Sequence, residues 1–163
     1  MGIVADAREA LRQGHDLGWT LPLVAALGSD GHRWSLRWVE RCLRRLLPFA
    51  EVDDQAAVLA AIEGLSDYEG STPSQEEVWE RSYEISWPRW YAARIAVCHL
   101  YRAWWYSRFQ SNNQFIVAQE AALRLMLEGT GRAEELREAV LEEYERVSAE
   151  AVPKVAPDCS GIT

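Results

Sequence analysis

The chain has 163 residues, of which 48% are hydrophobic and 26% are charged. This composition is typical of a folded globular protein and excludes a disordered or low-complexity chain. The formal net charge is -8, with 25 acidic and 17 basic residues. It argues against nucleic acid and anionic membranes as partners, because both require a basic surface. We expect a single domain over residues 1–150 and a flexible tail over residues 151–163.

Helical periodicity and turn residues define the first half of the chain. Apolar residues recur every three or four positions, and Pro or Gly stands where each repeat ends. Four helices are expected here, with these signals: Val4, Ala7 and Leu11 before Gly14; Thr20 and Pro22 before Gly28; Ser29 or Asp30 as cap, then Trp34, Trp38, Cys42 and Leu46 before Pro48; and Asp53 or Asp54 as cap, then Val58, Leu59 and Ile62 before Gly64.

Four further helices are expected in the second half. Thr72-Pro73-Ser74-Gln75 predicts a helix start with Thr72 as cap and Pro73 in the first helical position. That helix breaks at Ser86-Trp87-Pro88. Residues 89–109 are apolar almost all round, which is typical of the buried centre of a bundle. A seventh helix follows Ser111-Asn112-Asn113, and an amphipathic eighth ends before the tail.

No segment alternates as a strand does, so the fold class we predict is all-α. The expected architecture is a single-domain helical bundle or irregular helical array of about seven to eight helices. No stretch is long and apolar enough for a transmembrane helix, and the N-terminus lacks the features of a signal peptide. The expected location is therefore the cytoplasm.

The chain lacks the motifs that would indicate an enzyme, a metal or a cofactor. HExxH, Glu-x-x-His, GxxxxGK[ST], GxGxxG and GxSxG are all absent from the sequence. Cys42 and Cys98 lie among apolar residues and are expected to be buried thiols, whereas Cys159 lies in the tail. We expect a non-enzymatic protein without metal or cofactor. Modification of the tail at Cys159 is a minor alternative.

Basic residues gather on one side of the third helix, at Arg33, Arg37, Arg41, Arg44 and Arg45. Their spacing of three and four residues places most of them on one face. This face is either an anion-binding strip or a solvated face whose charges are answered by acids elsewhere in the fold. The net negative charge of the chain favours the second interpretation.

The segment from Glu51 to Glu84 contains ten acidic residues and a single basic residue, Arg81. Such an asymmetry either steers a basic partner toward the protein or reflects helix N-termini and solubility. The residues that we assign to a partner-binding acidic surface are Glu51, Asp53, Asp54, Asp67, Glu69, Glu76, Glu77 and Glu80.

Aromatic residues are dense between positions 79 and 106. They predict either core packing or a cleft with aromatic walls and a few polar groups. The residues that we assign to this alternative ligand site are Trp79, Tyr83, Trp87, Trp90, Arg94, His99 and Trp105.

Three stretches between residues 32 and 126 carry a resemblance to a known family: HRWSLRWVERCLRRLLPFAEV, AAIEGLSDYEGSTPSQEEVWERSYE and WYAARIAVCHLYRAW. They resemble immunity proteins of bacterial polymorphic-toxin systems. The shared pattern is a Trp- and Arg-bearing helix ending in Leu-Pro, an Ala-rich helix, a Gly-Ser-Pro loop, an E-E-V helix and an Ala- and His-bearing helix. The chain departs from that family in its high Trp content, its acidic C-terminal helix and its tail. The resemblance implies an intracellular, non-enzymatic, all-α protein that binds and neutralises a toxin.

The hypothesis that joins these observations is a cytoplasmic bacterial interaction protein, immunity-like, that binds a protein partner such as a basic toxin domain through its acidic surface. The alternative hypothesis is a module that binds a small molecule or peptide in the Trp- and Tyr-rich cleft.

Overall fold

The computed structural model describes residues 2–14, 17–87, 90–109 and 111–151, and the tail from residue 152 lies outside this description. All regular structure among the described residues is helical, which confirms the predicted fold class. Their elements are α1 (Ile3–Gln13), α2 (Leu21–Ala26), α3 (Gly31–Leu46), the 3-10 turn η1 (Leu47–Phe49), α4 (Gln55–Glu63), the 3-10 turn η2 (Gly64–Tyr68), α5 (Gln75–Ser86), α6 (Ala92–Arg108), α7 (Asn112–Thr130) and α8 (Ala133–Ala151).

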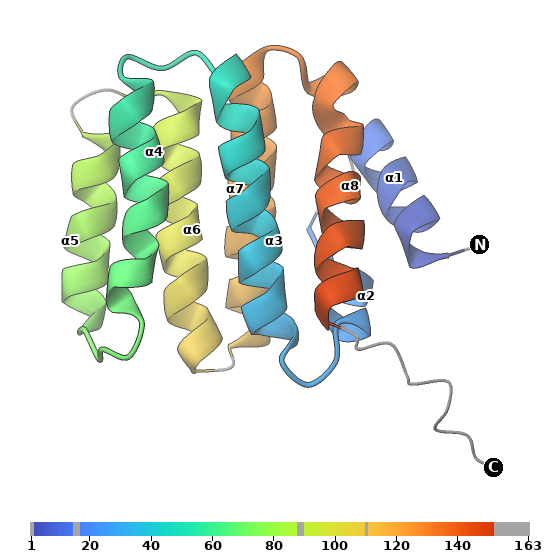
Figure 1. Cartoon of the computed structure of the whole chain (residues 1–163), viewed down its shortest axis with the longest axis horizontal. Coiled ribbons are helices and arrows are strands. Elements are labelled where there is room, and N and C mark those ends of the chain that lie inside the picture. The colour runs from blue at the N-terminus through green and yellow to red at the C-terminus, as the bar shows by residue number, and fades with distance from the viewer. Residues whose placement is uncertain (1, 15–16, 88–89, 110, 152–163) are drawn as a thin grey trace.

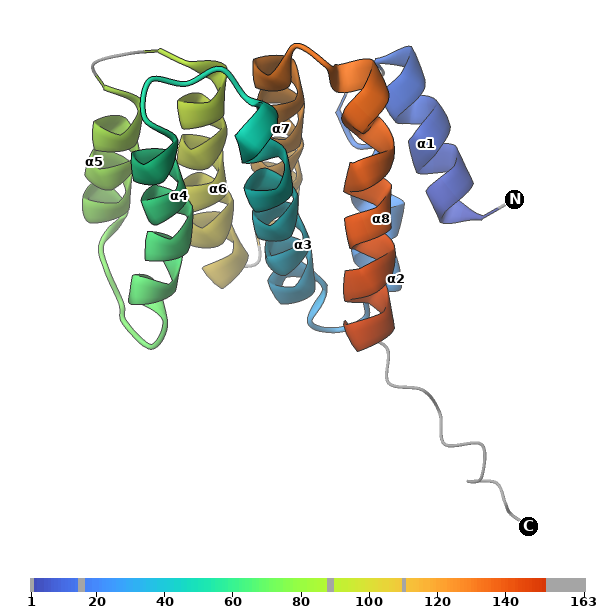
Figure 2. The ribbon, with the colours of Figure 1, turned by 45° about the horizontal axis from the view of Figure 1, so that its top comes forward.

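The long helices form two layers. In Figure 1, α4, α3 and α8 stand in front, and α5, α6 and α7 stand behind them. The turned view in Figure 2 shows the same separation, with α1 and α2 at the α8 end of the molecule. Between the layers, α3 packs on α6 and α7, and α4 packs on α6.

Helix α6 has contacts with α3, α4, α5 and α7, as expected for residues at the centre of a bundle. Leu100 and Tyr101 are fully buried, whereas Ile95 is only half-buried. However, α7 is buried along more of its length than α6, so α6 is not the most buried helix of the described structure. The C-terminal half of α6 instead leaves Trp104 and Trp105 half-exposed.

Trp38 of α3 joins three helices in the core. Its indole N–H donates to the carbonyl of Val140 on α8 at 2.8 Å, and its ring lies edge-on to Tyr144 at 5.2 Å between centroids. The hydroxyl of Tyr144 in turn donates to the carbonyl of Leu23 on α2 at 2.6 Å. These bonds satisfy the polar tips of two buried rings and fix α2, α3 and α8 together.

Gly31 allows α2 and α3 to approach closely at their junction. A Cβ atom at this position would lie 2.6 Å from the carbonyl oxygen of Val24 and 3.2 Å from its Cγ1. Any larger residue would therefore push the first turn of α3 away from α2.

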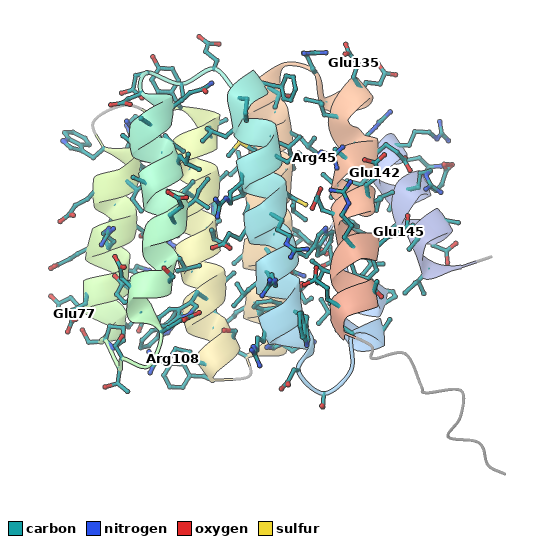
Figure 3. The ribbon with its side chains drawn as sticks, viewed as in Figure 1. Arg45, Glu77, Arg108, Glu135, Glu142 and Glu145 are labelled. Atoms are coloured by element: carbon teal, nitrogen blue, oxygen red, sulfur yellow. The ribbon has the colours of Figure 1, made fainter. Side chains whose placement is uncertain are left out.

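The basic face of α3 is answered by acids of neighbouring helices. Arg45 bonds Glu142 and Glu143 of α8 at 2.7 and 2.9 Å, and Figure 3 shows Arg45 beside Glu142. Arg41 bonds Glu150 at 2.8 Å. The interpretation as a solvated face with answering acids is confirmed for these arginines, and the face is a seam between α3 and α8.

The start of α5 differs from the predicted one by two residues. Ser74, not Thr72, is the N-cap, and its hydroxyl accepts a hydrogen bond from the backbone N–H of Glu77 at 3.1 Å. Pro73 therefore precedes the cap instead of opening the helix. Glu77 explains the choice, because it is the third residue after Ser74, where an acid favours the positive end of the helix.

Candidate functional site

The acidic residues assigned to one surface lie at two ends of α4. Glu51, Asp53 and Asp54 precede this helix, whereas Asp67 and Glu69 follow it. In Figure 1 the helix runs from the top to the bottom of the front layer, so these two groups occupy opposite ends of the molecule. The structure therefore separates the acids before α4 from Asp67 and Glu69, which follow it.

Two acids of that set have partners within the fold. The carboxylate of Asp53 receives two hydrogen bonds from Arg94 on α6, at 2.8 and 3.2 Å, and this bonding holds the pKa of Asp53 below its ordinary value. Asp54 is the N-cap of α4 and accepts from the N–H of Ala57 at 3.0 Å. Both carboxylates hold α4 in place.

The residues assigned to the aromatic ligand site do not all line one cleft. Arg94, assigned to the aromatic ligand site, points instead to Asp53 and to the carbonyl of Ile85. Trp87 and Trp90 are both 65% exposed. His99 is half-buried, and burial, with the charges of Arg102 and Arg124, lowers its pKa to about 4.

A smaller group of rings and guanidinium groups does come together, on α5 and the C-terminal half of α6. We call it the aromatic edge. Arg102 lies over the rings of Trp79 and Tyr83, with its Cζ atom 5.3 and 5.4 Å from their centroids. Trp79 lies edge-on to Trp105 at 6.3 Å. The residues of the aromatic edge are Trp79, Tyr83, Arg102, Trp105, Arg108 and Phe109.

The two arginines of the aromatic edge have ring partners but no carboxylate partner among the described residues. Arg108 lies over Trp104 and Trp105, at 5.0 and 5.5 Å from the ring centroids. One nitrogen of each guanidinium group, Nε of Arg102 and Nη1 of Arg108, is buried without a hydrogen bond in the described part of the chain. Cation–π contacts therefore take the place of ion pairs here.

A second feature is a groove of about 1010 Å³ between the first half of α3, η2 and the end of α6. Trp34 stands on the α3 side, and Trp104 comes from α6. Its size falls within the range of protein ligand sites, and it is open to solvent. The lining residues are Leu21, Val24, Ala25, Gly28, Ser29, Asp30, Gly31, His32, Arg33, Trp34, Leu36, Arg37, Glu40, Leu65, Ser66, Glu69, Trp104, Ser107 and Asn112.

Three carboxylates line this groove, at Asp30, Glu40 and Glu69. None of them forms an ion pair or a side-chain hydrogen bond with another described residue. Glu40 is half-buried, and burial raises its pKa although Arg44 and Arg37 oppose the shift. A carboxylate in this position gains from an added cation, because burial has removed part of its hydration.

Each basic residue that lines the groove has an interaction partner within the described structure. Arg37 lies 3.6 Å from Glu150. His32 stacks on Phe115 and shares a 2.8 Å hydrogen bond with Asn112. Arg33 lies over the Trp34 ring at 5.7 Å. The groups left without a charged partner are therefore mainly negative.

Of the groove residues, the sequence analysis assigned only Glu69 to the acidic partner-binding surface, and it placed Arg33 and Arg37 on the basic face of the third helix. Glu40 was the acid in a run of arginines on the third helix, and that departure from the pattern was the available signal. Trp34 and Trp104 are 70 positions apart in the chain, so only the fold shows that they line the same groove.

The described thiols, Cys42 and Cys98, are buried as expected, and burial raises the pKa of both. Among the described residues, no group of three or more His, Cys, Asp or Glu is placed to hold a metal ion. None of the described helices combines the length and the apolar character needed to cross a membrane.

No protein-family model, no curated protein and no solved structure matches the chain.

Proposed function

We propose that this protein is a non-enzymatic binding protein that holds a basic segment of a protein partner in the groove between α3 and η2. The observation that carries the proposal is Glu40, a half-buried carboxylate without an ion pair in the groove wall. Asp30 and Glu69 add two more carboxylates along the same groove.

Arginine and lysine side chains fit this chemistry. Their charged ends supply the ion pairs that these carboxylates do not form within the described structure, and their aliphatic stems pack on apolar surface. Trp34 and Trp104 provide that surface, together with Leu36 and Leu65. Because exposed charges also steer association, the unpaired carboxylates of the groove favour a basic partner.

Neutralising a basic toxin domain is the form of this function that we favour. The resemblance to bacterial immunity proteins implies it, and a cytoplasmic location accords with it. The division of the acids over two ends of α4 restricts the proposed contact to the acids near η2, with Glu69 in common with the sequence prediction.

Binding of an octa-arginine peptide, measured by calorimetry near physiological salt, tests the proposal. We expect the Glu40→Gln/Glu69→Gln variant to weaken binding at least tenfold, which corresponds to about 1.4 kcal/mol. The matched control is Glu134→Gln/Glu145→Gln, which removes the same charge from exposed positions on α8.

An equal loss in both variants would show that only the overall charge matters, and would overturn the proposal. Octa-glutamate should not bind to either chain. A change in tryptophan fluorescence on peptide binding that disappears in Trp34→Phe would place the peptide in the groove.

A further inference from the structure

The aromatic edge lies beside unpaired charges of both signs. On α5, Glu76, Glu80 and Glu84 are exposed and form no ion pair with any described residue. On α6, Arg102 and Arg108 also lack a carboxylate partner within the described ranges. Figure 3 shows Arg108 and Glu77 at the same end of this side of the molecule.

Several charged residues on other helices form ion pairs within the chain. Arg8 of α1 bonds Glu138 at 2.7 Å, and Arg44 of α3 bonds Glu63 at 3.1 Å. The α3–α8 seam repeats this pattern with Arg45. At the aromatic edge, by contrast, the two arginines lie over rings, and the acids of α5 point to solvent.

Tyr83 of α5 neighbours charged groups of both signs. It is three residues after Glu80, so the two side chains are neighbours on the α5 surface. The guanidinium group of Arg102 lies over the ring of Tyr83, with its Cζ atom 5.4 Å from the ring centroid.

We propose that the aromatic edge is the interface of a two-fold symmetric homodimer. In a two-fold interface the same patch meets itself, so it must carry groups that complement one another. The acids of α5 in one copy then pair with Arg102 and Arg108 of the other, and the rings of Trp79 and Tyr83 pack near the axis. Tyr83 and Phe109 are 54% and 57% exposed, and they become buried in this arrangement.

The composition of the edge agrees with this role. Trp, Tyr and Arg dominate the energetically important positions of protein interfaces. The guanidinium groups already rest on rings, so little side-chain freedom remains to be lost when a carboxylate binds. The inference uses no groove residue and does not depend on the proposed binding function.

Sedimentation velocity of the full chain from about 1 to about 100 µM tests the dimer. We expect a dimer at the upper end of this range for the wild type. Glu80→Arg/Glu84→Arg should raise the dimer Kd at least tenfold, since these side chains are exposed and their reversal leaves the fold intact. The matched control is Glu145→Arg on α8, which should dimerise as the wild type does.

Mixing provides the second measurement. The Arg102→Glu/Arg108→Glu variant should likewise raise the dimer Kd at least tenfold, and an equimolar mixture with Glu80→Arg/Glu84→Arg should form a heterodimer. A wild type that stays monomeric over the whole range overturns the inference, and so does a dimer that Glu80→Arg/Glu84→Arg leaves unchanged. If the arginine variant does not fold, the comparison of Glu80→Arg/Glu84→Arg with Glu145→Arg decides alone.

Discussion

Glu120 on α7 accepts hydrogen bonds from both the backbone N–H and the hydroxyl of Thr20, each at 2.7 Å, across 100 positions of sequence. Its other carboxylate oxygen accepts from the N–H of Gly18, also at 2.7 Å. Glu120 is only 4% exposed, so three donors balance the burial of one carboxylate. The chain that leads into α2 is thereby fastened to the middle of α7.

Replacing Glu120 by Ala should lower the free energy of unfolding by about 2–4 kcal/mol, because buried donors lose their acceptor. Urea denaturation at neutral pH measures the change. Glu128→Ala, an exposed position on the same helix, is the control and should change stability by less than about 0.5 kcal/mol. Equal effects at the two positions would contradict a bonding role for Glu120.

Leu100 lies fully buried in α6, and Leu100→Ala should destabilise the protein by about 2–5 kcal/mol through lost transfer energy and a cavity. Ile95→Ala should have a smaller effect, because Ile95 is half-buried. Thermal or urea unfolding of both variants ranks them, and the reverse order would show that α6 is packed differently.

The two candidate N-caps of α5, Ser74 and Thr72, predict different effects of alanine substitution on stability. Ser74→Ala removes the acceptor for the N–H of Glu77 and should lower stability by about 1 kcal/mol. Thr72→Ala changes an exposed residue before the helix and should have an effect below about 0.5 kcal/mol. If Thr72→Ala proves the more damaging change in urea unfolding, the helix begins where the sequence pattern placed it.

The pH dependence of stability should report on His99. Burial lowers the pKa of this imidazole from 6.5 to about 4 in the folded chain. Below pH 6.5 the unfolded chain therefore takes up a proton that the folded chain does not, and stability falls as pH falls toward 4. Because His99 is half-buried, we expect a loss on the order of 1 kcal/mol between pH of about 7.5 and about 5.5.

The comparison variant is His99→Gln, which carries no proton in this range. Urea unfolding of both chains at the two pH values isolates the contribution of the imidazole. Bonds to arginines hold the pKa values of Asp53 and Glu138 below their ordinary values, so these carboxylates remain ionised throughout. An identical pH dependence in the two chains would refute the assignment.

The helices could be predicted from the sequence where apolar residues at helical spacing are buried in the core. Val140, Tyr144 and Val147 recur at helical spacing in α8, and all three are buried. The start of α5 was less predictable, because Thr72 and Ser74 are both good caps and the choice depends on Glu77 two residues beyond the expected motif.

The candidate site was harder to predict because local spacing does not reveal which charges find partners. Asp53 and Arg94 were assigned to different sites, yet they bond each other across 41 positions. Glu40 remains without an ion pair in the described structure, because its helical neighbours Arg37 and Arg44 pair instead with Glu150 and Glu63. Which charges form ion pairs depends on how the helices pack against one another, and a single sequence does not show that packing.

The bond between Trp38 and Val140 spans 102 positions, and it sets an order of events during synthesis. At about 5–20 residues per second, the ribosome needs roughly 5–20 s to add that intervening chain. During this interval the emerging polypeptide holds a tryptophan whose covering helix does not yet exist. Until α8 leaves the exit tunnel, the side of this indole that α8 covers in the fold stays open to solvent.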